Sequence, residues 1–362
     1  MNRKTNKIYG VISIAVPVAL MFAVLLFCRT AYKYDIGKII LFSICSALLF
    51  AVLNVFLHEI GHVIFGKANG FTLITLTIFF FKWTKTQKGT EFSLIGFNDC
   101  AGSTEMAVKS TENVNNKIIN MTKGGIFFNA VLTLVCVVPF FMASVIPMWA
   151  YILWGIGLPI SAYCLLSNAL PQYVGNARND GGVIFGLKHG DDESKVTVNL
   201  FKIESELLSG RTPAQIDKSL YFDLPQLPED SLTYLSLLSA RYFYHLDCKD
   251  YEGAKTVASR FISLYEYLPK GTINVLKTYL LYSYCTFDFD EEKADELMFE
   301  LEKHLNNNND ALSVLTKLAY IFFVDGNKTA FDIFYKKGIK EAEKMKIKGL
   351  GAFYKDRLNQ IN

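Results

Sequence analysis

The apolar residues of this chain gather in its first half, in four stretches long enough to cross a lipid bilayer. The stretches are residues 8–28, 39–65, 125–146 and 149–170, and about 20 apolar residues suffice for a spanning helix. Beyond residue 190 no comparable stretch occurs, and the sequence becomes charged, with apolar positions at helical spacing. The pattern predicts an α-helical polytopic membrane domain at residues 1–190, followed by a soluble region.

The soluble region divides again. Residues 191–230 read as a linker of helix and loop, and residues 231–362 as an all-α domain. Small residues recur in three similar segments of this domain at Ala254, Ala294 and Ala330, at intervals of 40 and 36. The spacing favours a tetratricopeptide-like array, whose concave surface could receive a cytosolic regulator. A plain helical bundle that regulates or stabilises the membrane part is the alternative.

Between the second and third stretches the pattern changes to period two. Residues 71–83 begin by alternating Thr with apolar side chains, as expected of a half-buried strand. Residues 85–89 read as a turn, residues 91–97 as a returning strand, and residues 108–121 as a loose loop or short helix. We therefore expect a small β-hairpin at the membrane interface, anchored by Trp83 and the neighbouring Phe side chains.

Composition and charge narrow the possible classes. The chain has 51% hydrophobic and 20% charged residues, a mixture typical of a membrane part joined to a soluble part. A net charge of +3 without a basic stripe argues against nucleic acid as a partner. The seven Cys include no C-x-x-C pair and do not suggest a disulfide framework.

Loop charges predict the orientation in the membrane. The segment between the second and third stretches carries seven Lys, whereas the turn near residues 144–148 carries no charge. The excess of positive charge places that segment in the cytosol, and four spans then place both termini there as well. The small size favours a prokaryotic cell membrane. The orientation of the first helical hairpin stays open, because its connection carries Arg29, Lys33 and Lys38.

The second stretch contains His58-Glu59-Ile60-Gly61-His62. Residues four apart on an α-helix share a face, so both imidazoles can reach one metal ion, and Glu59 lies within a turn of them. This is the H-E-x-x-H pattern of zinc metalloproteases. A charge at the centre of the bilayer costs roughly 2–3 kcal/mol, so a purely structural helix gains nothing from these residues. Histidines that merely bond to neighbouring helices are the alternative.

A catalytic zinc ion usually takes three protein ligands and a water. The candidate for the third ligand is Asp180, which follows the end of the fourth stretch near Pro171. Gly181 and Gly182 allow a sharp turn at the ligand, and Pro171 stops the helix so that the chain can fold back. Asn-Asp-Gly-Gly is also an ordinary turn sequence, which is the alternative.

These elements resemble the site-2 protease family of intramembrane zinc metalloproteases. That family has H-E-x-x-H in one spanning helix and N-x-x-P…D-G at the cytosolic side of a later one, matched here by Asn168 to Pro171 and by Asp180-Gly181. The segment Gly125 to Asn129 is similar to the family's G-P-x-x-N element, with Ile in place of Pro. The resemblance covers about residues 39–187. Eight residues separate Pro171 from Asp180, where the family commonly has four.

The resemblance implies a mechanism. One Zn²⁺ per chain would be held by His58, His62 and Asp180, and Glu59 would move a proton from the metal-activated water to the leaving amine. The substrate would be a membrane protein or peptide precursor, cleaved near the cytosolic face and held in extended form by strand addition to the sheet. A hairpin that merely packs on the helices is the alternative.

Two Asn residues near these elements have roles that stay open. Asn168 could hydrogen-bond the substrate carbonyl or the backbone, and would then be a catalytic residue, or it could cap its own helix before Pro171. Asn129 is polar in apolar surroundings, so we expect it to bond across helices.

Two other functions remain possible from the sequence. One is a non-catalytic membrane scaffold that recruits a partner through its helical C-terminal domain. The other is a metal transporter or sensor that uses the same ligands. The presence of Glu59 argues against the scaffold, which has no use for a general base.

Overall fold

The computed structural model is mostly helical and describes residues 3–32, 36–96, 101–142, 145–265, 268 and 270–361. It divides into two compact units that interleave along the sequence. The first unit comprises Met1–Phe79, Ala101–Met106 and Asn115–Ser194, and the second comprises Phe80–Cys100, Ala107–Val114 and Lys195–Asn362.

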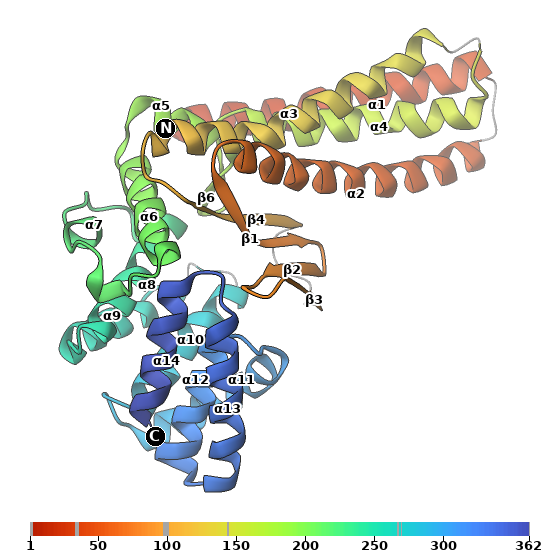
Figure 1. Ribbon diagram of the computed structural model, residues 1–362. Helices are drawn as coiled ribbons and strands as arrows, with labels where there is room; N and C mark the ends of the chain where they lie inside the picture. Colours follow the sequence, from red (N-terminus) through yellow and green to blue (C-terminus); the bar gives the residue numbers. More distant parts are fainter. Residues whose placement is uncertain are drawn as a thin grey trace. The chain divides into compact units, whose positions relative to one another are not determined.

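Four long helices form the body of the first unit and lie side by side (Figure 1). They are α1 (Arg3–Tyr32), α2 (Ile36–Ala68), α3 (Val114–Phe141) and α4 (Met148–Ala169). Each is long and apolar enough to cross a membrane. Helix α4 packs against both α1 and α2, and large apolar side chains such as Phe22 and Leu134 remain exposed, as expected of surfaces that face lipid.

Helix α3 begins earlier than the sequence pattern indicates. The predicted loop or short helix at residues 108–121 is largely helical, and α3 starts at Val114 rather than at residue 125. Its 28 residues measure about 42 Å at 1.5 Å per residue, against about 30 Å of hydrocarbon. The polar first turns therefore extend beyond the apolar core that the sequence pattern detects. Residues 143 and 144, at the end of the predicted third span, lie outside the described residues.

The strands are β1 (Phe71–Ile78), β2 (Phe81–Lys85), β3 (Thr90–Leu94) and β4 (Gly102–Val108). In the first unit, β1 and β4 are hydrogen-bonded neighbours. In the second unit, β2 and β3 form an antiparallel hairpin in which Trp83 lies opposite Phe92. The predicted turn is present, with the Thr86 amide donating to the Gly89 carbonyl at 2.8 Å.

Two features of the strands differ from the prediction. The expected continuous strand at 71–83 is interrupted at Phe79, whose φ of 55° lies in the left-handed region and ends β1. Strand β4 was not predicted, because its first half is the polar run Gly-Ser-Thr-Glu and lacks an apolar alternation. Phe97, the predicted end of the returning strand, lies outside the described residues.

After α4 the chain forms a short hairpin and then turns into the helices that follow. These elements are β5 (Tyr173–Val174), β6 (Ala177–Arg178), α5 (Asp180–His189) and α6 (Asp192–Ser209). Strands β5 and β6 pair in antiparallel fashion, with Tyr173 opposite Arg178. Gly175 makes the intervening turn with φ 59°, a conformation that costs glycine little.

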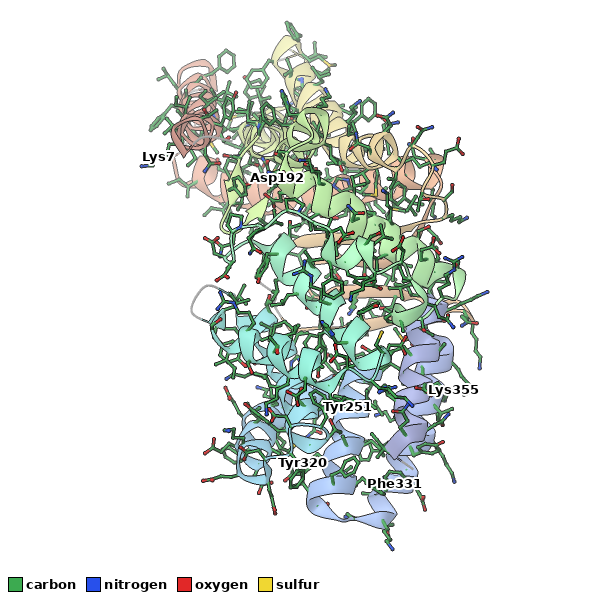
Figure 2. All side chains as sticks on the ribbon, turned by 90° about the vertical axis from the view of Figure 1, so that its left-hand side faces the viewer. Lys7, Asp192, Tyr251, Tyr320, Phe331 and Lys355 are labelled. Carbon is green, nitrogen blue, oxygen red and sulfur yellow. The ribbon has the colours of Figure 1, made fainter. Side chains whose placement is uncertain are left out.

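The second unit consists mainly of helices around one apolar core, which includes Leu281, Leu318 and Leu358. Its helices are α7 (Ser219–Phe222), α8 (Leu232–Asp247), α9 (Tyr251–Ile262), α10 (Lys270–Cys285), α11 (Glu291–Asn307), α12 (Ala311–Tyr320), α13 (Lys328–Lys344) and α14 (Lys348–Ile361). Figure 2 labels Tyr251, Tyr320, Phe331 and Lys355 on four of them.

Helices α9, α11 and α13 start where the sequence repeats suggested. Each begins on a capping side chain, Asp250, Asp290 or Asn327, which accepts a hydrogen bond from a backbone amide of the first turn. This agrees with three helix–turn–helix segments, while the tetratricopeptide-like arrangement itself stays a prediction.

The β2–β3 hairpin is attached to the end of α13 within the second unit. Thr86 forms a β-bridge with Met345, and the Gln87 amide donates to the Lys344 carbonyl at 2.9 Å. The Lys344 ammonium lies 3.1 Å from a carboxylate oxygen of Glu91. A segment encoded between two spanning helices thus belongs structurally with the C-terminal helices.

Candidate metal centre

Helices α2 and α3 approach closely beside the H-E-x-x-H motif because glycines face each other there. A Cβ added to Gly61 would lie 2.3 Å from the Gly124 carbonyl oxygen, and one added to Gly124 would lie 2.2 Å from that of Gly61. Small residues let spanning helices bring their backbones together in this way. One residue further, a Cβ on Gly125 would lie 2.5 Å from the His58 ring and 2.6 Å from the His62 ring.

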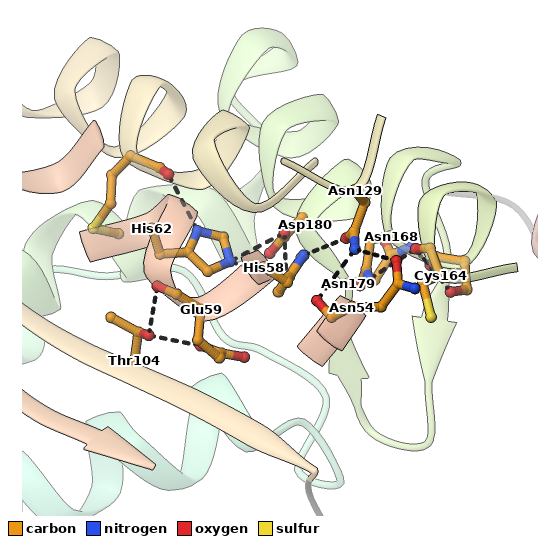
Figure 3. A network of polar contacts seen from close by, with 12 residues as sticks. Asn54, His58, Glu59, His62, Thr104, Asn129, Cys164, Asn168, Asn179 and Asp180 are labelled. Carbon is orange, nitrogen blue, oxygen red and sulfur yellow. Dashed lines mark hydrogen bonds and ion pairs between the residues drawn. The ribbon is translucent and has the colours of Figure 1, made fainter. Parts of the chain in front are cut away.

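Three candidate ligand atoms converge at this place (Figure 3). The Nε2 atoms of His58 and His62 are 3.1 Å apart, and Oδ2 of Asp180 lies 3.2 Å from the first and 3.3 Å from the second. In a tetrahedral zinc site with bonds of about 2.0–2.1 Å, neighbouring ligand atoms are about 3.3–3.4 Å apart. The triangle therefore has the size that a zinc ion needs.

The hydrogen bonds around the triangle leave lone pairs pointing into it. His62 Nδ1 lies 3.2 Å from the Met121 carbonyl oxygen, which only accepts, so this nitrogen is the donor. His58 Nδ1 lies 2.6 Å from Asn129 Oδ1. Asp180 Oδ2 is buried without a hydrogen-bond partner. Three acceptor atoms in contact repel one another unless a cation lies between them, so the donor set fits a metal ion.

Glu59 is held beside this cluster by β4. Its side chain is buried, and Thr104 on β4 donates a hydrogen bond from Oγ1 to Glu59 Oε2 at 2.6 Å. A Cβ added to Gly102 would lie 2.6 Å from the other carboxylate oxygen. The carboxylate also interacts electrostatically with both imidazoles and with Asp180. The arrangement provides an ionisable group for proton transfer next to three metal ligands.

Asp180 is delivered by the β5–β6 hairpin, which accounts for the residues in excess of the family's usual spacing. Asn179 closes this hairpin, since its Oδ1 accepts from the amides of Gln172 at 3.0 Å and Gly182 at 2.8 Å. Its side-chain amide donates to the Leu170 carbonyl at 2.7 Å. The longer loop therefore folds back on the end of α4, and Asp180 becomes the first residue of α5.

Arg178 secures the same hairpin from its other side. Its guanidinium donates two hydrogen bonds to Asp191, at 3.0 and 2.8 Å, and its Nε lies 2.8 Å from Glu193. Tyr173 donates to the same Glu193 oxygen at 2.7 Å. Burial alone would raise the pKa of Asp191, but the hydrogen bonds from Arg178 and Ser194 lower it below its ordinary value.

The two Asn residues left open by the sequence lie in different surroundings. Asn168 donates from its side-chain amide to the Cys164 carbonyl at 2.9 Å, one turn back on α4. That is a contact within its own helix, and its role toward a substrate stays a prediction. Asn129 bonds across helices as expected, and one of its partners is the predicted ligand His58.

Sequence reasoning missed Thr104, Arg178 and Asn54 as neighbours of the site. Thr104 and Arg178 carry no pattern that singles them out. Asn54 lies four residues before His58, so helical spacing alone places it on the same face of α2. The spacing therefore predicts where Asn54 lies, but it does not indicate what Asn54 does.

The sequence model of the protein family named peptidase family M50 matches residues 46–339 of this chain. The chain belongs to this family. M50 is the site-2 protease family, so the resemblance seen in the motifs is confirmed. Its members are zinc metallopeptidases, and with its four apolar helices the chain is a membrane metalloprotease. No similar chain was found among curated proteins or among solved structures.

Proposed function

We propose that this M50 protein is an intramembrane zinc endopeptidase that cleaves a peptide bond in or beside a spanning segment, near the cytosolic face. The observation that carries the proposal is the convergence of His58 Nε2, His62 Nε2 and Asp180 Oδ2 within 3.3 Å of one another. These three residues would hold one Zn²⁺ per chain, with Glu59 beside them.

The residues around the ion have separable tasks. Zinc, when bound, supplies a Lewis acid that lowers the pKa of a water molecule to about 7. Glu59 would accept a proton from the attacking water and would deliver it to the nitrogen of the departing amine. The Thr104 hydroxyl orients the Glu59 carboxylate, to which it donates a short hydrogen bond. The surrounding apolar helices limit the access of bulk water, which strengthens these interactions.

The substrate would bind in extended form along β4. This strand pairs with β1 on one side, and among the described residues no strand pairs with its other side. A free strand edge can take up an extended peptide through backbone hydrogen bonds. Because Thr104 lies on β4 and contacts Glu59, a peptide added there would run past the general base.

The β2–β3 hairpin supports an interfacial location for the sheet. The rings of Phe81, Trp83 and Phe92 contact one another, with centroids 5.6 to 6.1 Å apart, and Phe92 is exposed. Aromatic clusters of this kind favour the membrane–water interface. The loop charges support a cytosolic location for this hairpin and for both termini, and the small size of the chain supports a prokaryotic cell membrane.

Glu59→Gln tests the enzymatic proposal directly. The variant should keep about one zinc per purified chain and lose cleavage by roughly 10²- to 10⁴-fold, because only the proton acceptor is removed. Zinc is measured by elemental mass spectrometry. Cleavage is measured as new peptide termini in membranes of cells that express the variant or the wild type. Glu112→Gln, at an exposed carboxylate outside the strands and outside the metal cluster, is the matched control and should cleave normally.

The same variants separate the rival functions. A scaffold would yield no termini that depend on Glu59. A metal transporter or sensor would keep its function in Glu59→Gln and lose it in His58→Ala. If the wild type and Glu59→Gln give identical sets of termini, the protein is not an endopeptidase that uses this site.

A further inference from the structure

A line of buried polar side chains leads away from His58 into the membrane-spanning helices. It runs from His58 on α2 to Asn129 on α3, back to Asn54 on α2 and on to Ser161 on α4 (Figure 3 shows its first three members). Asn54, Asn129 and Ser161 are completely buried. Polar groups are costly at such depth unless each is hydrogen-bonded, so the bonds of this line are informative.

The backbone sets the direction of the hydrogen bonds at Asn54. The side-chain nitrogen of Asn54 lies 2.8 Å from the Phe50 carbonyl oxygen and 2.9 Å from Ser161 Oγ. A carbonyl oxygen only accepts, so the Asn54 atom facing it is the NH₂ group. The other end of the Asn54 amide, Oδ1, must then face Asn129 as an acceptor.

The hydrogen bonds of Asn129 run in the same donor-to-acceptor direction. Its side-chain nitrogen donates to Asn54 Oδ1 at 3.1 Å, because that atom only accepts. Asn129 Oδ1 therefore faces His58, at 2.6 Å from Nδ1. An oxygen that only accepts requires a proton on Nδ1. A neutral imidazole with its proton on Nδ1 has its lone pair on Nε2, the atom that points at His62 and Asp180.

We propose that Asn54 is a positioning residue for the metal centre: through Asn129 it fixes His58 as the tautomer that carries its proton on Nδ1 and presents Nε2 to the metal. The inference rests on the proposed metal site and extends it to a residue one turn before the motif. Partners of ligating histidines that act in this way typically change metal affinity 10- to 100-fold.

The second histidine shows why His58 needs this arrangement. His62 Nδ1 contacts the backbone carbonyl of Met121 directly. The orientation of this carbonyl is fixed by the helix, so it always offers an acceptor to His62. The side-chain amide of Asn129 can turn by 180° and offer its NH₂ group instead, which would favour the other tautomer of His58. Asn54 opposes that rotation because its Oδ1, 3.1 Å from the Asn129 nitrogen, would then face the Asn129 oxygen. The backbone carbonyl of Asn54 lies farther from the same nitrogen, at 3.4 Å, and stays in place in Asn54→Leu. The effect of Asn54 should accordingly be confined to His58.

The test compares zinc affinity in the purified full chain by competition with a chelator. Asn54→Leu, which keeps the approximate volume and removes both ends of the amide, should weaken zinc binding 10- to 100-fold. Ser46→Ala is the matched control, because Ser46 is equally buried on α2 and also bonds to α4, through the Leu153 carbonyl. It lies outside the line and should stay within about two-fold of the wild type. Zinc affinity of Asn54→Leu within two-fold of the wild type would overturn the proposal.

A rescue variant distinguishes positioning from packing. Asn129→Asp offers an oxygen to His58 whichever way the side chain turns. In the Asn54→Leu background it should therefore restore zinc affinity to within a few-fold of the wild type. If Asn54 only packed the helices together, the second substitution would not restore binding, and this result would contradict the proposal.

A measurement on the zinc-free wild type keeps the inference testable even if Asn54→Leu fails to fold. Nitrogen-15 shifts of His58, assigned by their loss in His58→Ala, should report a protonated Nδ1, and an Nδ1 without a proton would refute the proposal. The measurement also separates this inference from the proposed function. A wild type that binds no zinc would end the enzymatic proposal, while the tautomer of His58 would still be decided.

Discussion

Gly125 forms one wall of the metal cluster because a residue without a side chain leaves room for two imidazole rings. The rings of His58 and His62 stand edge to face, with centroids 4.6 Å apart. A Cβ at position 125 would lie 2.5 to 2.6 Å from them, well inside van der Waals contact. The spacing of the two Nε2 atoms therefore depends on the backbone of α3.

Gly125→Ala should weaken zinc binding at least ten-fold, because the methyl group forces one imidazole away from the other. Zinc content after dialysis against a weak chelator is the measurement. The control is Gly10→Ala, since a Cβ there has its nearest neighbour at an ordinary 3.7 Å. Normal zinc content in Gly125→Ala would mean that the rings can adjust and that the glycine only allows the helices to approach.

The sequence predicted which residues form the metal cluster, but it predicted only some of the contacts among them. The i, i+4 spacing predicted that His58 and His62 share a face, and the loop after Pro171 was expected to return Asp180 to them; the structure brings all three together. The pattern identified Asn129 as a polar residue among apolar ones without showing which helix it faces. That depends on how α2 and α3 pack, which no local pattern contains.

The β5–β6 hairpin is the element that places the third ligand. It is short, and its stability comes from the polar contacts of Asn179 and Arg178 rather than from an apolar core. The side chains of Arg178 and Glu193 are each 10% exposed. Removing one member of a buried ion pair leaves its partner charged and unpaired.

Arg178→Met should destabilise the protein by about 3–5 kcal/mol, because Glu193 then stays buried without its cation. Thermal unfolding in detergent is the measurement, and zinc content should fall with it as the hairpin loosens. Arg211→Met removes an ion pair whose Arg is 58% exposed and should change stability by less than about 1 kcal/mol. Equal unfolding temperatures for the two variants would contradict the assigned role of Arg178.

Element boundaries were predictable where apolar periodicity decides them and unpredictable elsewhere. Helices α1, α2 and α4 begin and end near the predicted spans, whereas α3 starts eleven residues early in a polar region. The break at Phe79 depends on one positive φ in a run of five aromatic or basic residues. Strand β4 is held by its neighbour β1 and by contacts with α2, so its own sequence shows little strand pattern.

At the scale of the molecule, the chain does not fold into units that follow one another along the sequence. The domain boundaries predicted at residues 190 and 230 place each residue in the same domain as its neighbours in the sequence. Residues 80–96 nevertheless group with the C-terminal helices, through contacts such as the bridge between Thr86 and Met345. A pairing across about 260 positions leaves no trace in local composition, so it could not be predicted from the sequence.

Lys344→Met should speed hydrogen exchange in the β2–β3 hairpin several-fold, since Lys344 pairs with Glu91 on β3. Exchange in α1, α2 and α4 should not change. Lys355→Met removes the ion pair with Glu343, the neighbour of Lys344 in the sequence, and should leave exchange in the hairpin as it is. Unaltered exchange in Lys344→Met would show that the backbone bonds alone hold the hairpin.

The attachment of the hairpin to α13 has a consequence for truncation. The β2–β3 hairpin precedes α3 in the sequence, but its partners Lys344 and Met345 lie near the carboxyl end of the chain. A fragment that stops after α5 would therefore keep the hairpin and lose the helix on which it rests. The aromatic rings of Phe81, Trp83 and Phe92 would remain in such a fragment without the backbone bonds that anchor their strands, and the shortened protein should aggregate more readily than the whole chain.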